Sequence, residues 1–258
     1  MEIRNGEVTL PITSSGKGQK IIFFNGVCST QIVWKGVVGH LSGRYEIVTF
    51  DFRSHGRASA AADHSFAAFL SDAESVMSAV GGGRPIMVAW SFGADLAVAY
   101  AASHPGMLAG LMIIDGALPL SDRLVEDEGQ MRRSLNSLSM KFSMLLMQAT
   151  AYRYALSGDD IADLTMIADE NRQGLLDVYG RIDCPIAMLL ATKTAGENNT
   201  AHTRRNNGLW REAGDRLAAR YPSIDITWLD AGHRLPLTMP AEIARRIDAF
   251  AGRIGEGC

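Results

Sequence analysis

The chain has 258 residues, of which 47% are hydrophobic and 21% charged, enough apolar material for one large folded core. Its formal net charge of -3 excludes the strongly basic surface that nucleic-acid binding requires. No apolar run approaches the roughly 18 residues that cross a bilayer, and the N-terminus lacks the pattern of a signal peptide. We therefore expect a cytoplasmic protein with no membrane insertion and no nucleic-acid partner.

Cysteine and glycine placement argues against a metal or an organic cofactor. Cys28, Cys184 and Cys258 are far apart, form no C-x-x-C motif and have no histidine at zinc spacing. The glycines at 81–83 precede a predicted strand, whereas a phosphate-binding glycine loop follows one. The sequence predicts a reducing compartment, no cofactor and a small-molecule substrate as partner, and it leaves the oligomeric state open.

Strand-like and helix-like segments alternate from the N-terminus to about residue 115. Continuous apolar runs that end at turn residues are typical of buried strands, and apolar residues at helical spacing are typical of amphipathic helices. In chain order, we predict an edge strand at "EVTLPI" (7–12), strands over 20–26 and 45–51, a helix over 65–81, a strand over 84–90, a helix over 92–106 and a strand over 108–115.

The pattern changes after about residue 120. Only helix-like sequence follows up to residue 181, and strands then resume over 184–192 and 223–232, before a last helix that begins at Pro240. This alternation predicts an α/β fold with a mostly parallel central sheet flanked by helices. The predicted domains are a core in two parts, 1–119 and 182–258, and an inserted helical cap, 120–181.

The stretch "MVAWSFGADLA" (87–97) places Ser91 at the junction of a buried strand and a helix. A serine at such a turn can present its hydroxyl above the sheet, next to the free N–H groups of the helix start. A serine turn of this kind, called a nucleophile elbow, usually has the motif G-x-S-x-G. Here Gly93 allows close packing of helix and strand, and Ala89 stands in place of the first glycine. Ser91 is therefore a candidate nucleophile, and an ordinary serine N-cap is the alternative.

His233 follows the last predicted strand and a short Ala-Gly turn, downstream of Ser91 in the chain. From a loop at that strand end it could reach Ser91 and act as its general base. The remaining histidines are interpreted as solvated. They are His40, His55, His64, His104 and His202.

Backbone N–H groups near the serine could form an oxyanion hole. A strand ends at Asn25 and Gly26 in "FFNGVCST", which frees the N–H groups that follow from the sheet. Val27 and Phe92 are the candidate donors, and a plain β-turn is the alternative. The segment "DFRSHGRAS" (51–59) also follows a strand, and we interpret it as structural rather than catalytic.

Together these segments resemble the α/β-hydrolase superfamily. "AWSFG" resembles its nucleophile elbow, "AGHRLPLTMPAEIA" its histidine loop and last helix, and "FFNGVCS" its oxyanion turn, with Asn25 in place of the usual histidine. "DFRSHGRAS" resembles its D-x-R-G-x-G-x-S turn, with Ser54 in place of a glycine. The resemblance covers almost the whole chain. It implies Ser91 as nucleophile, His233 as base, Val27 and Phe92 as oxyanion donors, and 120–181 as a variable helical cap.

Two carboxylates are candidates for the acid that orients His233. Asp115 ends the strand after the Ser91 helix, a position that some members of the family use. Glu197 lies on the loop after the next strand, three residues beyond Thr194, which occupies the other position used in the family. We favour Asp115 and keep Glu197 as the alternative.

Apolar side chains near the expected site favour a hydrophobic substrate. The segment "LSMKFSMLLM" (138–147) is rich in methionine and could line a pocket for a flexible acyl chain. A polar loop is expected over 194–208, and its Arg204 and Arg205 could meet an anionic group of the substrate or be solvated. The predicted pocket residues are Asn25, Cys28, Trp34, Trp90 and Met144.

The combined pattern predicts a serine hydrolase that cleaves an ester, thioester or lactone of a small-to-medium hydrophobic substrate through an acyl-enzyme. An acyltransferase with the same triad is an alternative, because "FFNGVCST" and "VAWSFGADL" faintly resemble the acyltransferase that joins hydroxyacyl chains in rhamnolipid synthesis. A carbon–carbon bond hydrolase or a cofactor-free perhydrolase is also compatible with the sequence. The alternative from another class is a non-catalytic ligand receptor on the same fold.

Overall fold

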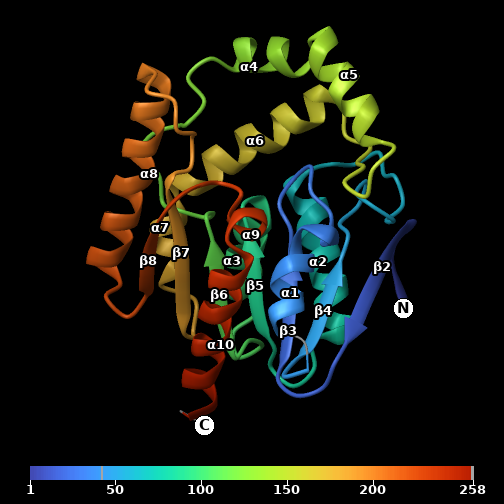
Figure 1. The fold of residues 1–258 in the computed structure, drawn as a ribbon, viewed down its shortest axis with the longest axis vertical. Helices are drawn as coiled ribbons and strands as arrows, with labels where there is room; N and C mark the ends of the chain where they lie inside the picture. Colours follow the sequence, from blue (N-terminus) through green and yellow to red (C-terminus); the bar gives the residue numbers. More distant parts are fainter. Residues whose placement is uncertain (42, 257–258) are drawn as a thin grey trace.

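The computed structural model describes residues 1–41 and 43–256, so Ser42, Gly257 and Cys258 lie outside the described residues. The described chain forms one eight-stranded sheet in the order β1-β2-β4-β3-β5-β6-β7-β8 (Figure 1). The pairs β1–β2 and β2–β4 are antiparallel, and all other neighbours are parallel. The strands are β1 Glu2–Asn5, β2 Val8–Ser15, β3 Lys20–Phe24, β4 Glu46–Phe50, β5 Ile86–Trp90, β6 Gly110–Ile114, β7 Ile186–Lys193 and β8 Asp225–Gly232.

Helices cover both faces of this sheet, which confirms the predicted fold class. Helices α1 and α10 pack against each other on one face, and α2 and α3 pack against each other on the other. A short 3-10 helix, Gln31–Trp34, precedes α1. The helices are α1 Lys35–Leu41, α2 Phe66–Val80, α3 Phe92–Ser103, α4 Glu128–Leu135, α5 Leu138–Met147, α6 Gly158–Gln173, α7 Leu175–Tyr179, α8 Ala201–Arg220, α9 Leu235–Thr238 and α10 Pro240–Glu256.

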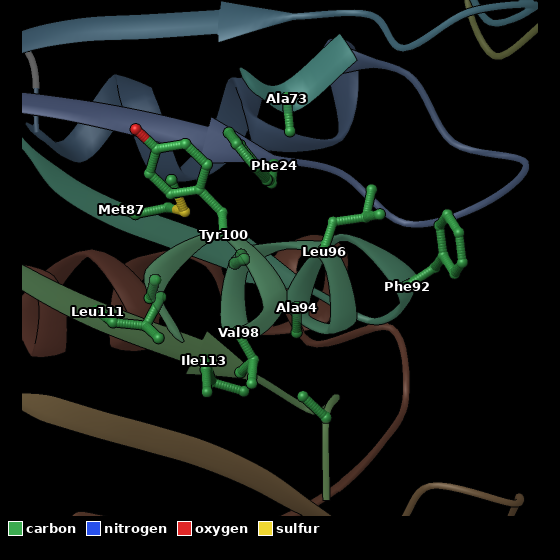
Figure 2. Close-up of a cluster of buried hydrophobic side chains, with 14 of the residues drawn as sticks. Phe24, Ala73, Met87, Phe92, Ala94, Leu96, Val98, Tyr100, Leu111 and Ile113 are labelled. Carbon is green, nitrogen blue, oxygen red and sulfur yellow. The ribbon is translucent and has the colours of Figure 1, made fainter. Parts of the chain in front are cut away.

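Successive residues of the central strands belong to opposite faces, and both faces are apolar. In β5, Met87 and Ala89 belong to the core cluster around α2 and α3, whereas Ile86, Val88 and Trp90 belong to the cluster under α1 and α10. Figure 2 shows part of the first cluster, packed between the sheet and α3. Burial on both faces explains why these strands appear in the sequence as continuous apolar runs.

Helices α4 to α7 lie between β6 and β7 in the chain, and Figure 1 shows α4, α5 and α6 at the top of the molecule, above the central strands. Helix α5 contributes no buried residue, and several of its large apolar side chains are exposed. These are Leu138, Phe142, Leu145 and Leu146. The interpretation of 120–181 as a cap stays a prediction. None of the helices in the described ranges is long and apolar enough to span a bilayer.

The predicted polar loop over 194–208 is wrong in its second half, because helix α8 begins at Ala201. Thr200 caps this helix by accepting a hydrogen bond from the Thr203 N–H. The first turns of the helix are polar, and its apolar anchors come only later in the sequence. The anchors are Trp210, Ala213 and Leu217, all buried.

A buried ion pair ties α6 to the start of α3. Arg172 donates from Nε and Nη2 to the two carboxylate oxygens of Asp95 over 2.9 and 2.6 Å, and both side chains are largely buried. Burial raises the pKa of Asp95, and the guanidinium of Arg172 opposes that rise. The pair therefore places a cation of α6 against a buried carboxylate of α3.

Replacing Arg172 by methionine should destabilise the protein by about 3–5 kcal/mol, because it leaves Asp95 buried and unpaired. The free energy of unfolding in urea measures the effect. Arg123→Met is the matched control, since Arg123 pairs with Glu170 at the surface and its loss should cost less than about 1 kcal/mol. Equal losses in the two variants would contradict the prediction, as would no recovery on adding Asp95→Leu to Arg172→Met.

Candidate active site

Ser91 occupies a strained turn between β5 and α3. Its φ of 56° lies in the left-handed region, and its N–H donates to the Ile114 carbonyl on β6 over 3.1 Å. A Cβ on Gly26 would lie 2.9 Å from the Ser91 Cβ, so only glycine lets the turn after β3 come this close. Such backbone strain costs about 1–3 kcal/mol and persists where the surrounding structure fixes it. The residue is therefore held in place from two neighbouring strands.

Ala89 does not need to be a glycine in this elbow. It lies inside β5 as an extended residue, with Phe24 and Ile113 as its partners on the adjacent strands. Its methyl group is fully buried in the core cluster around α3. The departure from the G-x-S-x-G pattern therefore leaves the geometry of the turn intact.

His233 lies directly after β8 and contacts Ser91 through its ring. The Ser91 hydroxyl donates to His233 Nε2 over 2.9 Å. Trp90 holds the histidine loop, because its Nε1 donates to the His233 carbonyl over 2.9 Å and the two rings lie 5.3 Å apart. The His233 side chain is 36% exposed, so water reaches the ring that contacts the serine.

Asp115 completes a hydrogen-bonded chain from the serine. His233 Nδ1 donates to Asp115 Oδ2 over 2.7 Å, and the Thr194 hydroxyl donates to the same oxygen over 2.8 Å. The other oxygen, Oδ1, accepts from the Ala191 N–H and from Trp210 Nε1, each over 2.9 Å. The carboxylate is fully buried, and all four contacts suit an ionised acceptor.

Of the two candidate acids, Asp115 is the one that the structure brings to His233. Glu197 is exposed on the loop after β7. Thr194, at the position where an acid was expected, instead donates to Asp115. Among the described residues, the carboxylate in contact with the His233 ring is therefore that of Asp115.

Two backbone donors near Ser91 have no partner in the described part of the chain. Phe92 is the first residue of α3, so its N–H has no acceptor inside the helix. The Val27 N–H follows Gly26, which contacts Ser91, and it donates to no other described group. Val27 and Phe92 therefore stay the predicted donors for a negative charge that develops at the serine.

Three of the predicted pocket residues belong to the framework of the site, and the prediction that they line a pocket is corrected. Trp34 is fully buried in the core, with its ring 4.9 Å from that of Phe23. Asn25 is buried, and its Nδ2 donates to the Ser29 carbonyl over 3.0 Å, which closes the turn after β3. Trp90 is buried and supports the histidine loop.

The other two, Cys28 and Met144, are half-buried and stay predicted pocket residues. Burial raises the pKa of the Cys28 thiol to about 12, opposed by a hydrogen bond with the Tyr154 side chain. A thiol with that pKa stays protonated near neutral pH, so Cys28 is a poor nucleophile. Of Cys28 and Ser91, which both follow carboxyl ends of strands, Ser91 is therefore the better candidate for the nucleophile.

The interpretation of His55 and His64 as solvated residues is wrong, because both rings are mostly enclosed. His64 forms a second Ser-His-Asp chain: its Nδ1 lies 2.9 Å from Asp160 Oδ1, and its Nε2 lies 2.8 Å from the Ser54 hydroxyl. Ser54, however, is buried and accepts the Ala61 N–H over 3.0 Å. This second chain therefore joins α6 to the core and presents no accessible hydroxyl.

The burial of His55 should make the protein less stable in mild acid. Burial lowers the pKa of His55 from 6.5 to about 4, so the unfolded chain takes up a proton that the folded chain cannot. Stability is full above pH 6.5 and falls as the pH drops toward 4, by on the order of 3 kcal/mol in total. Between pH 7 and 5, wild type should lose about 2 kcal/mol more of its unfolding free energy than His55→Gln. Identical pH slopes in urea titrations of the two proteins would contradict this.

Arg204 and Arg205 both have partners within the protein. Arg205 pairs with Asp122 over 2.6 Å and with Glu126 over 3.5 Å. Arg204 donates to the carbonyl and side chain of Asn199. Neither guanidinium is free for an anionic substrate in this structure.

Comparison with known proteins shows the family to which the chain is similar over most of its length. The family model described as "Alpha/beta hydrolase family" matches residues 21–246, which is most of the chain. A solved structure of a hydrolase from Pseudomonas aeruginosa superposes with a TM-score of 0.76 over 98% of both chains, at 15% identity. At 15% identity the superposition shows that the two proteins share a fold, and nothing about activity.

Two curated proteins match over shorter segments. The 2-(acetamidomethylene)succinate hydrolase of Mesorhizobium japonicum is 29% identical over 112 residues, 43% of this chain and 40% of that protein. The pimeloyl-[acyl-carrier protein] methyl ester esterase of Methylococcus capsulatus is 32% identical over 106 residues, 41% of this chain and 40% of that protein. The matched segments thus span about two fifths of the length of these relatives.

Proposed function

The chain belongs to the alpha/beta hydrolase family, and we propose that it is a serine hydrolase that cleaves an ester, thioester or lactone through an acyl-enzyme. The observation that carries the proposal is the continuous chain of hydrogen bonds from Ser91 through His233 to Asp115. A hydroxyl, an imidazole and a buried carboxylate in this order are the parts needed to activate a serine.

In the proposed reaction, His233 Nε2 takes the proton of Ser91 as the serine oxygen attacks the substrate carbonyl. The N–H groups of Val27 and Phe92 bind the oxyanion, and Asp115 stabilises the imidazolium. His233 then gives the proton to the leaving group, so that its bond to the acyl carbon breaks. Water, activated in the same way by His233, releases the acid and restores Ser91.

An uncharged, apolar substrate of small to medium size fits the surroundings best. A groove of about 590 Å³, a volume within the range of small-molecule sites, opens between the start of α2 and α6. Ser91 and His233 are not among its described lining residues, so we propose it as the place of the acyl group on the ground of its contact with Phe92. Its apolar lining includes Phe66, whose ring packs edge-on against that of Phe92. Asp160 and Asp163 also line the groove, where His64 and Arg132 pair with them. Its described lining includes no lysine or arginine, so an anionic acyl group would find no cationic partner there.

We favour hydrolysis over transfer to another hydroxyl, and the partly exposed side chain of His233 is open to the water that deacylation requires. The relatives that match by sequence include an esterase and another hydrolase, which agrees with this choice. Analysis of the products formed with and without an added alcohol separates the two outcomes. A product that is mostly the free acid is expected.

A series of p-nitrophenyl esters with acyl chains of increasing length tests the proposal directly. The enzyme should hydrolyse short-to-medium neutral esters, and a matched ester with a terminal carboxylate should react poorly. Thioesters and lactones of the preferred length then narrow the class. An absence of turnover with all of these substrates, together with an absence of serine labelling by a fluorophosphonate, would overturn the proposal.

A further inference from the structure

His55 connects two turns that lie at the carboxyl ends of β3 and β4. Its ring is buried, at 2% exposure, in the turn 51–59 that follows β4. The ring Nε2 accepts a hydrogen bond of 3.0 Å from the backbone N–H of Cys28, in the turn that follows β3. The second turn is the one that carries the Val27 N–H.

The protonation of His55 is fixed by its two hydrogen bonds. Because Nε2 accepts, the proton of the neutral ring is on Nδ1, which donates to the Arg53 carbonyl over 2.7 Å. Arg53 is itself anchored, since its N–H, Nε and Nη2 donate to Asp72 on α2 over 3.1, 2.8 and 2.8 Å. Through these contacts the imidazole fixes the position of the Cys28 N–H relative to α2 and the turn 51–59.

Cys28 needs such support because its backbone is in the left-handed region, with φ of 56°. A cysteine adopts that conformation at a cost, and the hydrogen bond from its N–H to His55 helps to hold it there. The peptide that this bond orients is the one directly after Val27. An oxyanion donor acts only when it points at the place where the charge develops, within about 0.5 Å.

We propose that His55 is a positioning residue that holds the Val27 N–H in the geometry of an oxyanion donor. The inference rests on the proposed function, because it concerns the same reaction. His55 does not act alone on this segment: Asp51 accepts the Gln31 N–H over 2.7 Å, so the loop stays attached when His55 is changed. Loss of the imidazole should therefore shift the turn locally rather than release it.

Two substitutions separate the hydrogen bonds of His55. His55→Asn keeps an amide near the Nδ1 position, which can still donate to Arg53, but it has no acceptor for Cys28. His55→Gln has an amide oxygen near the Nε2 position that can accept from Cys28, but it loses the bond to Arg53. We expect His55→Asn to lower kcat about 10–100-fold with KM within about threefold, and His55→Gln to stay within about threefold of wild type.

A transition-state analogue provides a readout that general loosening of the fold would not move. A trifluoromethyl ketone matched to the preferred ester forms a hemiketal oxyanion with Ser91, whereas the corresponding alcohol forms none. His55→Asn should weaken inhibition by the ketone by the same factor as kcat, with inhibition by the alcohol unchanged. Equal losses for ketone and alcohol, or equal kcat losses in His55→Asn and His55→Gln, would overturn the proposal.

Hydrogen exchange in the wild-type protein keeps the test decisive where His55→Asn fails to fold. The Cys28 amide should be protected, and exchange at the rate of an open loop amide would overturn the role of His55. The Ser91→Ala protein separates this inference from the function on which it rests. If wild type hydrolyses the ester and Ser91→Ala does not, but His55→Asn equals wild type, only the role of His55 is wrong.

Discussion

Replacing Ser91 by alanine should abolish hydrolysis of the preferred ester, with a fall in kcat of about 10³–10⁶-fold. The alanine removes the hydroxyl oxygen that forms the acyl-enzyme in the proposed reaction, and it leaves His233 Nε2 without its hydrogen-bonded partner. Residual activity would come from the oxyanion donors and from substrate binding alone. The measurement compares kcat of the two purified proteins and, in parallel, the mass added to each by a fluorophosphonate.

Ser54→Ala is the matched control, because Ser54 also sits at the end of a Ser-His-Asp chain. Its hydroxyl is buried and already accepts the Ala61 N–H, so labelling and kcat should stay within about threefold of wild type. Fluorophosphonate labelling that persists in Ser91→Ala, or that disappears in Ser54→Ala, would assign the reactive serine elsewhere. The comparison of Ser91→Ala with Ser54→Ala tests whether a Ser-His-Asp chain is enough for a reactive serine. We expect that the serine also needs access to substrate and nearby oxyanion donors.

The central sheet could be predicted because its strands are buried on both faces. Ile21 and Phe23 face one core cluster and Ile22 and Phe24 the other, so the run is apolar without interruption. Helix α8 begins in polar sequence, and its apolar anchors come only from Trp210 onward. A local sequence pattern therefore predicts an element well when consecutive residues are buried, as in β3. It misses the start of an element when only the later residues are buried, as in α8.

In the candidate site, too, the sequence predicts some residues correctly and misses others. The positions of Ser91 and His233 follow from strand ends, which chain order reveals. The burial of Trp34 and of His55 depends on neighbours such as Phe23 and Cys28, and no local pattern distinguishes a buried histidine from a solvated one. A signal for His55 was present only as its place in the turn that resembles the family motif.

The choice between the two acids depended on contacts between distant parts of the chain. Asp115 is held by Ala191 and Trp210, which lie 76 and 95 residues away in sequence. Thr194, at the other position considered, uses its hydroxyl to bind Asp115 rather than to replace it. The sequence alone could rank Asp115 above Glu197 as the acid. It could not show which of the two carboxylates would accept a hydrogen bond from the backbone of β7.

Replacing Asp115 by asparagine should lower kcat by about 10⁴-fold while leaving the fold intact. The reason lies in the donors around the carboxylate. The Ala191 N–H and Trp210 Nε1 both point at Oδ1, so the asparagine must keep its carbonyl oxygen there. Its NH₂ group then faces His233 Nδ1, which can only accept from it. The ring proton is forced onto Nε2, where it points at Ser91, and His233 no longer acts as a base.

Glu197→Gln is the control for this prediction, because Glu197 was the alternative acid and is exposed. It should keep kcat within about threefold of wild type, while Asp115→Asn keeps its thermal unfolding temperature but loses turnover. Steady-state kinetics on the preferred ester, with labelling of Ser91 as a second measure, decides between the two residues. A large loss in Glu197→Gln with little loss in Asp115→Asn would mean that the loop after β7 moves in the working enzyme. In that case Glu197, not Asp115, would support His233 during the reaction.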